Sequence, residues 1–194
     1  MLRRKAFILM IFLFVTAILF HVKEAESGTR EKYTRTIENY VVPDVVLVNQ
    51  DGKKIKLNAI LNSKKVIMVD FIFTTCTTIC PILSAEFISF QEKMGADPKD
   101  VQLVSISIDP EHDTPKKMKE YLKRYDAKPG WDFYTGQKND ILKVLKALNA
   151  YTPDKMSHLP LVLLYSSSNN QWVRIYGLLG TSDLLAEYRK VLRQ

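Results

Sequence analysis

The segment Val66–Phe73, with the sequence VIMVDFIF, is apolar almost without interruption. A strand with one face in water alternates apolar and polar side chains, whereas a strand covered on both faces does not. The run therefore predicts a central strand whose sheet carries helices on both faces. A hydrophobic content of 46% in 194 residues is enough to build such a core in one domain.

The rest of the chain supplies strands and helices to surround this strand. The apolar spacing predicts, in chain order, a hairpin with strands at 45–48 and 53–57, a helix over 82–94, a strand over 101–108, a helix from Pro115 capped by Asp113 or Thr114, a short strand over 131–134, a helix carrying 141–148, strands over 161–165 and 171–176, and a last helix capped by Ser182. Strands that alternate with helices in this way indicate the α/β class. We expect a central mixed β-sheet flanked by helices, with an N-terminal β-hairpin extension.

The first residues have the layout of a targeting segment. A basic head, Met1–Lys5, precedes the uncharged apolar run Ala6–Phe20. This pattern predicts that residues 1–22 form an N-terminal membrane anchor or a signal. No small-residue cleavage pattern follows, which favours the uncleaved anchor. Positive charge before the run keeps that end in the cytoplasm, so the rest of the chain is expected on the outer, oxidising side of the membrane.

Composition then changes twice along the chain. Residues 23–40 are polar and charged without a period and are predicted to be a tether, and 41–194 are predicted to be the folded domain. The formal charge is +7, but inside the domain Lys and Arg come at most in adjacent pairs. This scatter argues against nucleic-acid binding. An acidic protein partner or an anionic membrane surface suits the charge, and solubility alone is the alternative.

Both cysteines of the chain follow the central strand directly, in the stretch TTCTTICP. Cys76 and Cys80 are four residues apart, at the predicted junction of a strand and a helix. The partial positive charge of a helix N-terminus stabilises a thiolate, so the pair is placed for redox chemistry or metal binding. A structural disulfide is the alternative. It would close a loop of about five residues and contribute roughly 2 kcal/mol, near the low end for disulfides.

Two thiolates favour Cu(I) or zinc but leave the coordination of either ion incomplete, so a third ligand is expected. The chain has three histidines. His21 lies at the membrane boundary, and His112 lies in a polar loop and is interpreted as solvated. His158 directly precedes the strand over 161–165, and its loop can lie beside that of Cys76. Met156 could add a weak sulfur ligand, although a packing role suits it better.

Three stretches together resemble one known family. They are DFIFTTCTTICPILSAEF, SISIDPEHDTPKKMKEYLKRY and SHLPLVLLY, and the resemblance covers roughly residues 41–192. It is to the Sco/SenC family of membrane-anchored, thioredoxin-like copper proteins. The resemblance implies a thioredoxin-like fold and copper, as Cu(I) or Cu(II), bound by Cys76, Cys80 and His158. It also implies a bacterial inner-membrane protein that matures the binuclear copper centre of cytochrome c oxidase.

The resemblance leaves two ways to act on the copper-site subunit of the oxidase. One is copper delivery, in which the protein is a metallochaperone rather than an enzyme. The other is maintenance of the subunit's thiols. A thiol-disulfide oxidoreductase acting on other exported proteins is the alternative function, with Cys76 as the attacking thiol and Cys80 as the resolving thiol.

The sequence also departs from the pattern of the family it resembles. Thr77 stands where a proline is common, Thr78-Ile79 carries no acid, and Ser157 stands where an aspartate commonly precedes the histidine. Fewer negative charges near the site are expected to weaken a Cu(II) state in particular. Leu159-Pro160 resembles the cis-proline loop of thioredoxins, a feature that favours thiol exchange.

Overall fold

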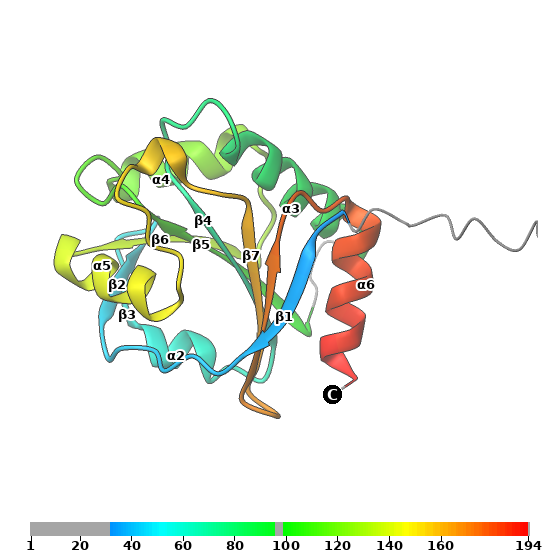
Figure 1. The fold of residues 1–194 in the computed structure, drawn as a ribbon. Helices are drawn as coiled ribbons and strands as arrows, with labels where there is room; N and C mark the ends of the chain where they lie inside the picture. The colour runs from blue at the N-terminus through cyan, green and yellow to red at the C-terminus, as the bar shows by residue number, and fades with distance from the viewer. Residues whose placement is uncertain (1–31, 96–98, 194) are drawn as a thin grey trace, which may run out of the picture. The chain divides into compact units, whose positions relative to one another are not determined.

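The computed structural model describes residues 32–95 and 99–193. These residues form one eight-stranded sheet in the order β1-β8-β7-β4-β5-β6-β2-β3, with helices packed against it (Figure 1). The strands are β1 (Thr34–Glu38), β2 (Val46–Asn49), β3 (Lys54–Lys56), β4 (Val66–Ile72), β5 (Val101–Ser107), β6 (Trp131–Gly136), β7 (Leu161–Ser166) and β8 (Gln171–Tyr176). The helices are α2 (Leu57–Leu61), α3 (Cys80–Met94), α4 (Pro115–Arg124), α5 (Lys138–Ala147), the 3-10 turn η1 (Lys155–Ser157) and α6 (Thr181–Leu192).

The predicted central strand is confirmed. All seven residues of β4 are buried, and the strand lies between β5, to which it is parallel, and β7, to which it is antiparallel. β5 and β6 are also parallel, whereas β2 pairs with β6 in the antiparallel sense. The sheet is therefore mixed and carries helices on both faces, as the α/β prediction requires.

Alternate residues of β4 face two separate cores. Met68 and Ile72 pack in the cluster that includes buried side chains of α3, α4 and α6. Ile67, Val69 and Phe71 pack in the cluster that includes buried side chains of α2 and α5. Each fully buried side chain of this size contributes about 1.5–3 kcal/mol, so both faces of the strand stabilise the fold.

Most other predicted elements form, with corrections at their ends. The hairpin is present as β2 and β3, but the chain enters α2 at Leu57 instead of continuing as a strand. The predicted cap of α4 is confirmed at Thr114, whose hydroxyl accepts the backbone N–H of Lys117. The cap predicted for the last helix is wrong, because α6 begins at Thr181 with Gly180 as its N-cap and Ser182 lies inside the helix.

The strand β1 was not expected. Its five residues fall within the predicted tether, 23–40, but instead pair along their whole length with β8. Figure 1 shows β1 beside α6, and the carboxylate of Glu187 on that helix accepts hydrogen bonds from Tyr33 and Arg35. The predicted anchor, 1–22, lies outside the described residues. Among the residues that are described, no helix is long and apolar enough to cross a membrane.

A glycine after β8 allows the N-terminal part of the described chain to approach closely. Gly177 has a φ of +127°, and a Cβ there would lie 3.0 Å from the Cα of Tyr33. Its N–H donates to the carbonyl of Pro160 at 3.0 Å. A residue with a side chain would be strained and crowded at this position.

Candidate metal centre

The two cysteines lie where β4 gives way to α3. We call Phe73–Ile79 the cysteine loop. Cys76 lies within it, with its N–H donating to the carbonyl of Phe73 at 3.2 Å, and Cys80 is the first residue of α3. Pro81 occupies the first turn, where the missing N–H of proline has no helical partner to lose. The start of the helix is therefore fixed directly behind the cysteine loop.

His158 reaches the cysteines through the pairing of β7 with β4. These strands are antiparallel and place Val162 opposite Asp70, so the residues before β7 lie beside those that follow β4. We call Lys155–Pro160 the histidine segment. It begins with η1, where the carboxylate of Asp154 caps the N–H of Met156. The 3-10 turn at the start of the segment and strand β7 directly after it set the position of the imidazole.

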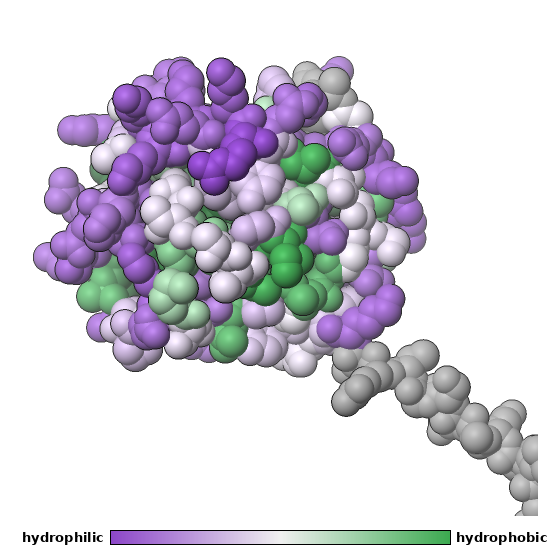
Figure 2. All heavy atoms as spheres, turned by 90° about the horizontal axis from the view of Figure 1, so that it is seen from above, coloured by the Kyte–Doolittle hydropathy of each residue, from purple (hydrophilic) through white to green (hydrophobic). Residues whose placement is uncertain are grey.

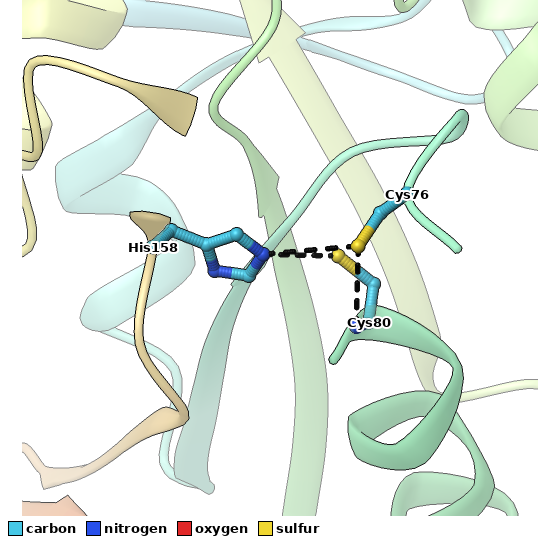
Figure 3. A group of neighbouring side chains, drawn as sticks. All are labelled: Cys76, Cys80 and His158. Carbon is cyan, nitrogen blue, oxygen red and sulfur yellow. Dashed lines mark hydrogen bonds between the residues drawn. The ribbon is translucent and has the colours of Figure 1, made fainter. Parts of the chain in front are cut away.

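The structure brings together the three predicted ligands (Figure 3). His158 Nε2 lies 3.3 Å from Cys80 Sγ and 3.9 Å from Cys76 Sγ, and the three donor atoms all lie within 4.8 Å of one another. All three residues are buried, with exposed fractions of 6% for Cys76, 0% for Cys80 and 8% for His158. Both cysteines are free thiols.

The other candidates from the sequence lie elsewhere. The ring of His112 is hydrogen bonded to Asp109 at 2.9 Å, and its side chain is 61% exposed. Met156 is also exposed. His21 lies outside the described residues. Within the described chain, His158 is thus the histidine that joins the two thiols.

The pKa values of the two thiols are shifted in opposite directions. Burial opposes ionisation of Cys76, but hydrogen bonds from the Cys80 thiol, the backbone N–H groups of Cys80 and Thr78 and the Thr78 hydroxyl hold its pKa below the ordinary value. One of these contacts is from Cys80 N to Cys76 Sγ at 3.4 Å. Burial, with the neighbouring Cys76 second, raises the pKa of Cys80 strongly. The pair therefore offers one readily formed thiolate and one retained proton.

His158 is held as a neutral imidazole. Burial lowers its pKa, because an imidazolium would be poorly solvated there. The ring of Phe73 packs edge to face against it, with centroids 5.7 Å apart. Its Nδ1 has no hydrogen-bond partner among the described residues. The hydroxyl of Ser157, the residue before it, donates to Asp154 and not to this nitrogen. The neutral ring leaves a nitrogen lone pair available to a metal ion.

The donor set selects the class of metal. Two thiols and an imidazole are soft or intermediate ligands, which suit copper(I) or zinc and not calcium or magnesium. Structural zinc sites use four protein ligands, one more than this group supplies. Three buried donors of this kind therefore fit copper(I) well.

Two further residues near the site have features that the sequence patterns did not predict. The described residues contain no cis peptide bond, so Leu159-Pro160 is trans and differs in this respect from the cis-proline loop that its sequence resembles. Asp70 on β4 is fully buried, and both its carboxylate oxygens have no partner among the described residues. Its signal in the sequence is the single charge within VIMVDFIF.

Exposed apolar side chains flank the site. Figure 2 views the end of the molecule that carries the cysteine loop and η1, and hydrophobic and neutral side chains gather at its middle within a hydrophilic border. Ile82 follows Cys80 in α3, Met156 and Leu159 flank His158, and all three side chains are more than 40% exposed. This end of the molecule therefore presents apolar surface next to a buried group of metal donors.

Comparison with known proteins gives a consistent match. The sequence profile of the SCO1/SenC family matches residues 34–192. A SCO1 protein homolog of Bacillus subtilis (strain 168) is 41% identical over 99 residues, which is 50% of this chain and 50% of the homolog. The matched region spans about half the length of this relative and of a SCO2-like protein of Rickettsia typhi.

Solved structures share the fold over most of the described chain. BsSco, described as a Sco-family cytochrome c oxidase assembly protein with a disulfide switch, superposes with a TM-score of 0.67 at 29% identity, covering 81% of this chain and 96% of BsSco. ScoI of Bradyrhizobium japonicum with copper bound gives a TM-score of 0.64 at 27% identity, covering 78% of this chain and 99% of ScoI. These matches confirm the thioredoxin-like fold.

Proposed function

Because the chain belongs to the SCO1/SenC family, we propose that it is a copper-binding assembly factor for the binuclear copper site of cytochrome c oxidase. One observation carries the proposal: the sulfurs of Cys76 and Cys80 and Nε2 of His158 lie within 4.8 Å of one another in a buried group. The copper-bound ScoI structure of Bradyrhizobium japonicum, which has the same fold, supports copper as the ion.

Copper is the cargo in this proposal, and each residue has a separate part in holding it. Cys76 is the first ligand, because its thiolate forms most readily. Cys80 is buried and must release its proton when it binds the ion, so the affinity rises with pH. His158 is already neutral and binds without losing a proton.

The partner and the location extend the proposal. BsSco is described as a member of a family of cytochrome c oxidase assembly proteins, which supports the copper-site subunit of the oxidase as partner. The basic head and apolar run at residues 1–20 support anchoring in the bacterial inner membrane, with the folded part on the outer side. The exposed apolar side chains beside the site suit contact with a protein partner.

A titration of the reduced protein with copper(I) against a competing chelator tests the copper site. We expect Cys80→Ser and His158→Ala each to lower the affinity at least tenfold, a loss of about 1.4 kcal/mol or more. Lys119→Met is the control, because its exposed ammonium pairs with Asp51. Unchanged affinity in both Cys80→Ser and His158→Ala would exclude the proposed site.

Thiol-disulfide exchange is the second candidate, and the unequal thiols favour it. In this reaction the Cys76 thiolate attacks a partner's disulfide and forms a mixed disulfide, releasing one partner thiol. Cys80 then loses its proton and attacks Cys76, which leaves a Cys76–Cys80 disulfide and a fully reduced partner. The disulfide switch described for BsSco is consistent with such a pair.

Trapping separates the two candidates. Cys80→Ser lacks the resolving thiol, so mixed disulfides with partners should accumulate in native membranes, and Cys76→Ser should show none. A reduction potential well below about −300 mV, the range of inert structural disulfides, together with no trapped partner, would rule out exchange.

A further inference from the structure

We infer that a third loop, which supplies no metal ligand, sets the distance between the thiols and the imidazole. This brace loop is Ser107–Thr114, and its carboxylates Asp113 and Asp109 act as positioning residues for the cysteine loop and the histidine segment. The inference deepens the proposed function, on which it rests for the identity of the site.

The sheet places the brace loop next to the cysteine loop. β4 and β5 are parallel neighbours, and the register pairs Ile72 with Ser107 at their carboxyl ends. The N–H of Ile108 donates to the carbonyl of Ile72 at 3.0 Å, one residue beyond that pair. The loops that follow the two strands therefore leave the sheet side by side.

Asp113 holds the cysteine loop. Its side chain is fully buried, and Oδ1 accepts the hydroxyl of Thr74 at 2.5 Å and the backbone N–H of Thr74 at 3.2 Å. Thr74 stands two residues before Cys76, and the neighbouring Phe73 carbonyl accepts the N–H of Cys76. Hydrogen bonds to a buried carboxylate are among the stronger ones, so this contact fixes the loop where it leaves β4.

Asp109 holds the histidine segment. Its Oδ2 accepts the ammonium of Lys155 at 2.5 Å, and its Oδ1 lies 2.9 Å from the ring of His112. Lys155 begins η1, and its carbonyl accepts the N–H of His158 at 3.4 Å. The same ammonium lies 5.3 Å from the centroid of the Phe73 ring, which packs against the imidazole of His158. Lys155 therefore links the brace loop to the histidine segment, through its own backbone, and to Phe73 of the cysteine loop, through its ammonium.

One hydroxyl joins the two carboxylates. Ser107 Oγ donates to Asp113 Oδ2 at 2.6 Å and accepts the N–H of Asp109 at 3.0 Å. His158 is 82 residues from Cys76 and 78 residues from Cys80 along the chain. The Ser107 hydroxyl links Asp113, which holds the cysteine loop, to Asp109, which holds the histidine segment. Both carboxylates are occupied by protein donors and are absent from the group of metal donors, so they act through other residues.

The contact between Lys155 and Asp109 and the contact between Thr74 and Asp113 can be broken separately. Lys155→Met removes the ammonium but keeps a long apolar side chain, and Asp109→Asn weakens the same contact from the other side. Thr74→Val removes the hydroxyl bonded to Asp113, and Thr74→Ser restores it. Lys138→Met is the matched control, because its ammonium pairs with exposed Glu111 in the same loop and reaches neither segment.

The first readout requires no metal. In the reduced metal-free protein, Lys155→Met and Asp109→Asn should shift and broaden the imidazole resonances of His158 in a nitrogen-15 spectrum. Both should change the alkylation rate of Cys76 at pH 7 less than Thr74→Val does. Thr74→Val should change that rate severalfold and leave the His158 resonances in place, and Thr74→Ser should return the rate to the wild-type value.

The second readout is copper(I) affinity, which should fall about tenfold in Lys155→Met, Asp109→Asn and Thr74→Val, the size usual for residues that support metal ligands. Lys138→Met and Thr74→Ser should bind as the wild type does. Equal responses of His158 and Cys76 to every variant, or no response to any, would overturn the assignment. A wild-type protein that binds no copper(I) would refute the copper site alone, because the metal-free readouts still decide whether the loop positions the two segments.

Discussion

Two cysteines four residues apart carry thiols with opposite tendencies to ionise. Cys76 receives hydrogen bonds at sulfur, which lower its pKa in spite of burial, whereas Cys80 is fully buried as the first residue of α3 and its pKa is raised. Because the thiolate is the reactive form, the chemistry of the pair starts at Cys76.

Alkylation of the reduced protein near pH 7.5 should therefore modify Cys76 first. We expect peptide mapping by mass spectrometry to find iodoacetamide on Cys76 well before any appears on Cys80. Cys76→Ser is the control, and its remaining thiol should stay unmodified until the protein unfolds. Equal rates at the two cysteines would contradict the assignment of the attacking thiol.

Asp70 is a buried acid without a hydrogen-bond partner among the described residues, and burial raises its pKa to about 7. In the unfolded chain the group has an ordinary pKa near 3.9. Between about pH 4 and pH 7 the folded state thus holds a proton that the unfolded state has released. Folding stability falls as the pH rises through this window, because the unfolded state binds fewer protons there.

Asp70→Asn should remove this part of the pH dependence. Between pH 4.5 and pH 7.5 the wild type should lose on the order of 3 kcal/mol more unfolding free energy than the variant, at 1.36 kcal/mol per pKa unit. Urea unfolding of both proteins at several pH values measures the difference. Parallel curves would show that the carboxyl ionises as readily in the folded state as in the unfolded one.

Single residues differ in how well the sequence reveals them. Cys76, Cys80 and His158 were selected from the sequence by their chemistry and by a family resemblance, and the structure brings them together. Asp113 was considered only as a helix cap. Its contact with Thr74 spans 39 residues, and local patterns contain no information on a hydrogen bond of that range.

Among the elements, β1 and α6 depend on one buried carboxylate. Glu187 accepts from Arg35 at 2.7 Å and from Tyr33 at 2.9 Å, and it also pairs with Lys190. Burial opposes its ionisation, but these bonds hold the pKa of Glu187 below its usual value. Its contribution to stability is present above the ordinary glutamate pKa and is lost as the pH falls below it.

Glu187→Gln should loosen β1 without affecting the metal donors. We expect about 2 kcal/mol of destabilisation, because the charge-assisted bonds are lost but one carbonyl acceptor is kept. Hydrogen exchange at Thr34–Glu38 should accelerate, while amides of β4 stay protected. Lys190→Met removes only the exposed partner and should change exchange little; equal acceleration in both variants would contradict the role of Arg35 and Tyr33.

Gly177 places a steric limit on the same part of the fold. A Cβ there would lie 3.0 Å from Tyr33 Cα and 3.1 Å from the carbonyl oxygen of Lys32. Gly130 also has a positive φ, but nothing lies within 4 Å of its Cβ position. A side chain would strain the backbone at both positions, but only at Gly177 would it also be crowded.

Gly177→Ala should therefore destabilise the protein more than Gly130→Ala, by roughly 1–3 kcal/mol, the usual cost of overpacking. The midpoints of chemical unfolding of the two variants measure the difference. Equal midpoints would mean that β1 moves aside at no cost.

At this scale the sequence predicts buried elements better than exposed ones. The apolar run of β4 and the hydrophobic residues of α3 specify their structure locally. β1 has the sequence TRTIE and a largely exposed face, so it has the composition of a linker. What makes it a strand is its pairing with β8 and its contact with Glu187, more than 150 residues away.

For the molecule as a whole, copper(I) should act as a stabilising ligand. A free concentration one hundred times the dissociation constant adds about 2.7 kcal/mol to the unfolding free energy. For a domain of this size that corresponds to a rise of roughly 5–10 °C in the unfolding temperature. Calorimetry of the reduced protein with and without copper(I) measures it, and His158→Ala should lose most of the shift. A copper(I) chelator should reverse the shift in the wild type, and an equal rise in His158→Ala would point to binding elsewhere.

The overall arrangement was predictable in outline because alternating strands and helices restrict the topology of an α/β sheet. The order of the strands was not, since β7 joins the sheet beside β4 across a stretch of nearly ninety residues. Only this pairing places His158 at the thiols.

That pairing also sets an order of events during synthesis. A chain made from its N-terminus presents Cys76 and Cys80 long before His158, and β4 lacks its neighbour β7 until residues 161–166 have emerged. Until then the two thiols lack the imidazole that contacts both of them. A nascent chain arrested before residue 158 should thus have two readily oxidised thiols, whereas the completed protein encloses them.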